Sequence, residues 1–152
     1  MMVRIVRLAG LVLFVAAFFL PAVRNGGDAG AGSGPIVGYV CAMFAGAASA
    51  SIVHPVSAWQ GKDMAGALCL MLSGWVNALV PIYLLFTFWS RLVVIRRVLA
   101  AAILICFAAT WVFFAKAPMV PLIGHFLWVA GALLILAGEI VPRASKRSTK
   151  EI

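Results

Sequence analysis

Five long apolar segments, separated by short polar breaks, constrain the fold of this chain more than any other feature of its sequence. They cover residues 8–23, 36–53, 64–88, 98–115 and 119–141. An α-helix rises about 1.5 Å per residue and a bilayer core is about 30 Å thick, so the third and fifth segments are long enough to cross it. The first and fourth need a few flanking residues. Because short alternating stretches typical of β-barrels do not occur, the sequence predicts an all-α polytopic membrane bundle.

The composition indicates that lipid is the solvent for most of the chain. Hydrophobic residues make up 65% of it and charged residues only 11%, whereas a soluble domain carries about 25% charged residues. The net charge is +8, but the basic residues lie almost entirely between the apolar segments. Membrane topology explains that placement better than phosphate binding does. We therefore expect the lipid bilayer, and no nucleic acid, as the partner.

The positions of the basic residues indicate how many segments cross. If all five cross with the N-terminus inside, four basic residues lie inside and eight outside, against the positive-inside rule. If all five cross with the N-terminus outside, eight basic residues lie inside and four outside, but Arg4 and Arg7 must then be moved across the membrane. If residues 36–53 begin and end outside, nine lie inside and three outside. The sequence therefore favours four transmembrane helices with both termini in the cytoplasm; five transmembrane helices are the alternative.

The segment 36–53 is the weakest candidate for a crossing. It contains no leucine, and half of it is Ala, Gly or Ser, which contribute little to membrane insertion. Gly38, Ala42, Gly46 and Ala50 recur every four residues, a spacing that gives a helix a smooth face for close approach of a neighbour. We expect a re-entrant or protein-packed helix on the outer side, in contact with the same chain or with another subunit.

Glycines also recur in the fifth segment, every seven residues, at Gly124, Gly131 and Gly138. A heptad of small residues is typical of close, left-handed packing between helices. We therefore expect this side of the fifth segment to lie against another helix.

Three polar or helix-breaking residues follow one another at helical spacing in the third segment, namely Ser73, Asn77 and Pro81. Pro81 has no N–H, so the carbonyl of Asn77 loses its helical partner and a kink is expected. An amide inside a membrane is costly unless it is bonded, so Asn77 must face protein or water. The sequence predicts a hydrogen bond between helices, with a polar path around a hinge as the functional alternative.

The ionisable residues near the segment ends do not form a complete chemical site. His54 precedes a proline and His125 follows Gly124, and no cluster of cysteines or carboxylates completes a haem or metal site beside them. Glu139 lies four residues before Arg143, a spacing that favours an ion pair at headgroup level. The three cysteines are widely spaced, which argues against a disulfide scaffold. We expect no cofactor and no metal.

One integral membrane domain is predicted over residues 1–142, followed by a basic cytoplasmic tail over 143–152. The glycine-rich residues 24–35 are expected to lack regular structure. The N-terminal apolar segment follows two arginines and is interpreted as a retained anchor rather than a cleaved signal peptide. Compactness and basic inner loops favour the inner membrane of a bacterium.

The function that the sequence favours is structural or accessory. No segment carries a nucleophile with its base, a phosphate-binding loop or metal-ligand spacing, so an enzyme is not expected. The small-residue helix faces would pack against a second copy or a partner membrane subunit. The alternative is an oligomeric transporter, channel or holin-like pore that uses the polar residues around Asn77, and a third class is a haem-binding membrane subunit.

Overall fold

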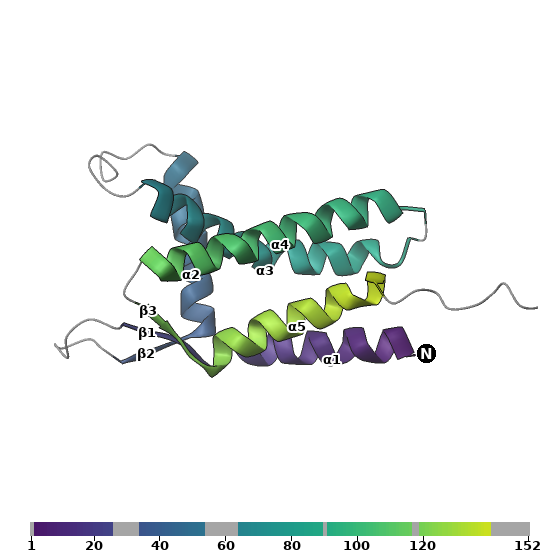
Figure 1. Ribbon diagram of the computed structural model, residues 1–152, viewed down its shortest axis with the longest axis horizontal. Helices are drawn as coiled ribbons and strands as arrows, with labels where there is room; N and C mark the ends of the chain where they lie inside the picture. The colour runs from purple at the N-terminus through teal and green to yellow at the C-terminus, as the bar shows by residue number, and fades with distance from the viewer. Residues whose placement is uncertain (1, 26–33, 54–63, 90, 117–118, 141–152) are drawn as a thin grey trace, which may run out of the picture.

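The computed structural model describes residues 2–25, 34–53, 64–89, 91–116 and 119–140. These residues form five helices and three short strands (Figure 1). The helices are α1 (Met2–Ala17), α2 (Gly38–Val53), α3 (Met64–Phe86), α4 (Val93–Lys116) and α5 (Ile123–Ile140). The strands are β1 (Pro21–Asn25), β2 (Pro35–Val37) and β3 (Met119–Pro121). The prediction of a mostly helical chain is confirmed.

Four helices lie roughly along the long axis of the molecule, and successive ones run in opposite directions (Figure 1). They are α1, α3, α4 and α5, and the most extensive contacts are those of α1 with α5 and of α3 with α4. The fifth helix, α2, runs across the others close to the sheet. The start of α1 and the end of α5 therefore lie together, at the opposite end from the sheet.

The small sheet was not predicted from the sequence. β1 is its central strand and pairs antiparallel with both β2 and β3, so that Val23 lies opposite Ile36 on one side and Pro121 on the other. The expectation that residues 24–35 lack regular structure was wrong at both ends of that range, where β1 finishes and β2 begins. Each strand contains a proline, which removes a donor and ends the helical pattern. Strands of three to five residues are too short for periodicity to reveal.

The helices and the apolar segments differ at their ends. α1 begins before the predicted segment and includes Arg4 and Arg7, and α4 likewise includes Arg96 and Arg97 in its first turns. Arginine has a high helix propensity, so a helix can include arginines. An apolar segment defined from the sequence ends where the arginines begin, and the helix is therefore longer than the segment. α1 ends at Ala17 because the chain turns into β1, and α5 begins only after β3.

The prediction of four or five transmembrane helices is not supported by helix length and composition. Among the described residues, two helices are long and apolar enough to cross a bilayer, at Leu68–Phe86 and Val93–Lys116. Ile123–Ala137 is apolar but shorter. Only 17% of the first span and 28% of the second is buried within the protein. These two helices are therefore mostly exposed, unlike the core helix of a soluble domain.

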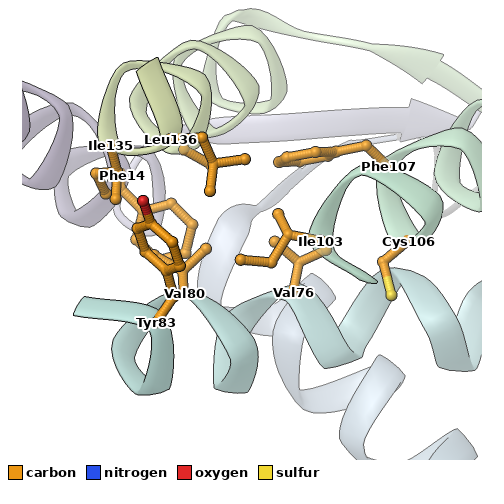
Figure 2. Packing of buried hydrophobic residues seen from close by; sticks show 10 residues of the cluster. Phe14, Val76, Val80, Tyr83, Ile103, Cys106, Phe107, Ile135 and Leu136 are labelled. Carbon is orange, nitrogen blue, oxygen red and sulfur yellow. The ribbon is translucent and has the colours of Figure 1, made fainter. Parts of the chain in front are cut away.

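The core lies between the helix pair α1–α5 and the helix pair α3–α4 (Figure 2). Side chains from all four helices meet there, and the largest fully buried ones are Val76, Val80, Tyr83, Ile103 and Ile135. The helices of the first pair approach closely at Gly10 and Gly131, where a Cβ atom on Gly131 would lie 2.7 Å from the carbonyl oxygen of Gly10. This contact explains why a glycine is needed at position 131.

Candidate functional site

The main cavity of the described structure has a volume of about 430 Å³ and lies where α2 crosses the bundle. Its walls come from α2, α3, α4, α5, the end of α1 and all three strands. Most of the lining is apolar. The lining side chains with polar atoms are Cys41, Ser73, Asn77, Thr110, His125 and Trp128. We call this space the crossing cavity.

Gly38 fixes the position of α2 over the crossing cavity. Its N–H donates to the carbonyl of Leu20 at 3.0 Å, and the N–H of Tyr39 donates to the carbonyl of Phe18 at 2.9 Å. A Cβ atom on Gly38 would overlap the carbonyl oxygen of Ala17. Only glycine allows the backbones of α2 and α1 to approach so closely. The helix leaves this contact and passes over α3, and the crossing cavity lies beneath it.

Asn77 is held by a hydrogen bond between two helices. The indole Nε1 of Trp128, on α5, donates to its Oδ1 at 2.9 Å. Trp128 is positioned by two aromatic neighbours, with its ring centroid 5.0 Å from that of Phe107 and 6.3 Å from that of Phe14. The indole N–H is a donor only, so the amide oxygen must face it. The amide NH₂ is then left as a donor at the wall of the crossing cavity.

His125 lies in the first turn of α5 and is surrounded by aromatic rings. Its centroid is 4.8 Å from that of Phe114, 5.5 Å from that of Trp111 and 5.6 Å from that of Trp128. The side chain is 5% exposed, and its Nε2 has no hydrogen-bond partner in the described part of the chain. Gly124 lets this turn lie directly against the carbonyl of Pro21. A buried imidazole nitrogen without a partner is unusual.

Two further polar groups contribute to the walls of the crossing cavity. The hydroxyl of Thr110 is buried and donates to the carbonyl of Cys106 at 2.9 Å, so its remaining capacity is that of an acceptor. The thiol of Cys41 lies on α2, and desolvation by burial raises its pKa. It is therefore a neutral thiol at neutral pH and a poor nucleophile.

Six of the residues that the sequence singled out line the crossing cavity, namely Gly38, Ala42, Ser73, Asn77, Gly124 and His125. Pro81 lies within α3 and is exposed. Glu139 belongs to α5, but its side chain and the predicted partner Arg143 lie outside the described residues. His54 and the basic tail also lie outside them.

The small-residue face of α2 was expected to lie against the same chain or against another subunit, and within the single chain it is packed at Gly38 and open at Gly46. Gly38 is in close contact, but a Cβ atom on Gly46 would meet nothing within 4 Å. Gly46 instead borders an open groove between α2 and α3. The groove is lined by Ala42, Gly46, Gly74, Trp75, Asn77 and Ala78, and we call it the small-residue groove.

Sequence reasoning missed two residues of the crossing cavity, Thr110 and Trp128. Thr110 lies in an apolar segment without a polar neighbour at helical spacing, and Trp128 is 51 residues from its partner Asn77. No local pattern connects positions so far apart, although the need of Asn77 for a partner could be stated from the sequence. A search for every donor in the other segments would have included Trp128.

The chemistry of the crossing cavity is that of a neutral, mostly apolar site. None of its lining residues is charged. Within the described ranges, no group of three or more His, Cys, Asp or Glu residues is placed to hold a metal ion. No protein-family model, curated protein or solved structure matches this chain.

Proposed function

We propose that this protein is an integral inner-membrane protein that crosses the bilayer four times, with both termini in the cytoplasm and an accessory role in the membrane. Large apolar side chains are exposed along its helices, among them Val12 (60%), Val94 (74%) and Ile105 (63%). Contiguous apolar surface on this scale requires lipid or protein around it. The alternating directions of α1, α3, α4 and α5 support four crossings (Figure 1).

The charges at the two ends of the bundle support this orientation. Arg4, Arg7, Arg96 and Arg97 belong to the first turns of α1 and α4, at the end that holds the start of α1. The sheet end carries Arg24 on β1 and Lys116 at the end of α4. Positively charged residues are enriched on the cytoplasmic side. The sheet and α2 would then lie at the outer side.

The sheet compensates for the shortness of α1 and α5. α1 has 16 residues and α5 has 18, so at about 1.5 Å per residue both fall short of a core about 30 Å thick. The chain continues from α1 into β1 and enters α5 from β3, and these two strands pair with each other. β1 is the central strand, so its backbone groups are paired on both sides. β2 and β3 are edge strands, and open sheet edges do not occur in the hydrocarbon region. The sheet would therefore extend the α1–α5 pair into the outer interfacial region of the bilayer.

The observation that carries the accessory role is the open small-residue groove. Gly46 and Gly74 lie on its two sides, and a Cβ atom on Gly46 would meet no neighbour. Helices associate in membranes through small residues that allow close backbone approach. We propose that a helix of a second copy, or of a partner membrane subunit, packs in this groove. A pore around Asn77 stays a prediction of the sequence.

Gly46→Leu tests this role because it fills the groove from an open position. We expect the variant to fold and to lose assembly, measured by chemical cross-linking in native membranes and by the size of the detergent-solubilised particle. Ala101→Leu is the matched control, since it adds the same side chain at an exposed position of α4. Assembly that is unchanged in Gly46→Leu, or absent in the unmodified protein, would exclude the groove as a docking surface.

A further inference from the structure

The crossing cavity has the size and the lining of a small-molecule site. Its volume is about 430 Å³, within the range of about 300–1,000 Å³ that ligand pockets occupy. Such pockets are mostly apolar with a few convergent polar groups. Here the polar groups come from α2, α3, α4 and α5. The ligand that such walls favour is uncharged, because none of the residues lining this cavity is charged.

The hydrogen bond from Trp128 determines which polar atom of a ligand the cavity can recognise. The indole occupies Oδ1 of Asn77, so the amide offers N–H donors to a ligand. An N–H donor in an apolar wall pairs with an oxygen acceptor, and the simplest acceptor on an uncharged apolar molecule is a carbonyl. The 2.9 Å contact thus selects a carbonyl-bearing ligand over a hydrocarbon.

His125 contributes an uncharged aromatic wall to the cavity and not a second bonding atom for a ligand. Its side chain lines the cavity and is 5% exposed, and its Nε2 is fully buried without a hydrogen-bond partner in the described part of the chain. An oxygen atom in the cavity can therefore contact the ring but does not reach Nε2, and the selection of a ligand oxygen rests on Asn77.

We infer that the crossing cavity binds an uncharged, lipid-soluble molecule that carries a carbonyl oxygen, with Asn77 donating to that oxygen. Two sources share this chemistry, a quinone and the ester of an acyl lipid. The cavity and the small-residue groove share Ala42, Gly74 and Asn77, but the cavity belongs to a single copy of the chain, so this inference does not depend on the accessory role.

The test uses the full-length protein in nanodiscs of ether-linked phosphatidylcholine, which has no ester carbonyl, and a long-chain ketone that carries a photoreactive diazirine. We expect cross-links on peptides of α2, α3 and α5. The competitors 2-undecanone and undecane have the same chain length and differ by one carbonyl group. We expect 2-undecanone to compete at a concentration about tenfold lower, the effect of one well-formed hydrogen bond. Equal competition by the two would overturn the inference.

Three variants separate recognition from folding. Asn77→Leu should make the two competitors equally effective. The measured quantity is the ratio of the concentrations at which undecane and 2-undecanone compete, and a partial loss of folded protein does not change this ratio. Thr87→Val is the matched control. It also removes a polar group, a hydroxyl that donates to the carbonyl of Leu84 at 2.7 Å, but Thr87 does not line the cavity. Ala42→Phe should abolish labelling by filling the space while every polar group stays.

Labelling that persists in Ala42→Phe, or a preference for 2-undecanone that persists in Asn77→Leu, would contradict the assignment. Methyl decanoate and a short-chain benzoquinone, used as further competitors against the same probe, distinguish the two sources. Stronger competition by the ester supports an acyl lipid, and stronger competition by the benzoquinone supports a quinone.

Discussion

Ile103 and Ile105 are the same residue type on the same helix and lie in opposite surroundings. Ile103 is completely buried in the core between the helix pairs, whereas Ile105 is 63% exposed on the outside of α4. Ile103→Ala should lower the free energy of unfolding by about 2–5 kcal/mol, because it removes packed atoms and leaves a cavity. Ile105→Ala should stay within about 0.5 kcal/mol.

Titration with SDS in mixed micelles, followed by circular dichroism, measures both isoleucine variants under the same conditions. The comparison needs no assumption about the detergent, because the two substitutions delete the same atoms. Equal losses of stability would show that α4 does not present this face to the core.

Asn77 and Trp128 join α3 to α5 through a hydrogen bond between their side chains. A double-mutant cycle with Asn77→Leu and Trp128→Phe should give a coupling free energy of about 0.6–1.7 kcal/mol, the range found for hydrogen bonds between membrane helices. Trp75→Phe is the control, since Trp75 lies on α3 and is half exposed. A coupling of zero would mean that the bond does not form in the membrane.

At the scale of the element, glycines distinguish the helix faces that are packed from those that are open. A Cβ atom on Gly131 would lie 2.7 Å from the carbonyl oxygen of Gly10, whereas one on Gly46 would meet nothing within 4 Å. Gly131→Ala must therefore separate α1 from α5, and overpacking of this kind costs about 1–3 kcal/mol. Gly46→Ala should instead stabilise α2 by up to about 1 kcal/mol through helix propensity.

Thermal unfolding in detergent compares the two glycine variants directly. The expected shifts have opposite signs, and a destabilisation by Gly46→Ala as large as that by Gly131→Ala would contradict the assignment of an open groove. The element scale is also where the sequence was only partly informative. The seven-residue spacing of Gly124, Gly131 and Gly138 predicted a face packed against another helix. Gly131 lies against α1, Gly124 lies against Leu20 and β1, and the surroundings of Gly138 lie outside what the structure describes. The four-residue spacing on α2 predicted the same for Gly46, where the structure shows open space.

For the whole molecule, the arrangement of α2 decides the topology. If α2 packs at the outer side, then a cysteine introduced at Gly34 and one introduced at Ala65 are both labelled from outside by an impermeant maleimide. A cysteine at Arg91 should be labelled only after the membrane is opened. All three variants are made in a chain whose Cys41, Cys69 and Cys106 are replaced by alanine. Five crossings would place Gly34 and Ala65 on opposite sides.

The sequence by itself determined the apolar segments, the helical class and the places where polar groups need partners. These properties depend on local sums: a run of apolar residues favours lipid wherever it lies in the fold, and the amide of Asn77 needs a hydrogen bond in any apolar surrounding. Helix ends were less predictable, because a turn of helix containing Arg96 and Arg97 is not apolar but is still helical.

Only the tertiary structure decided which residues meet. Trp128 completes the amide of Asn77, Gly38 allows α2 to cross the bundle, and His125 reaches the same cavity from the start of α5. The three-stranded sheet joins segments from both halves of the chain. Such contacts depend on the angles at which helices cross and on where short strands pair. These are properties of the packed chain, and no stretch of neighbouring residues encodes them alone.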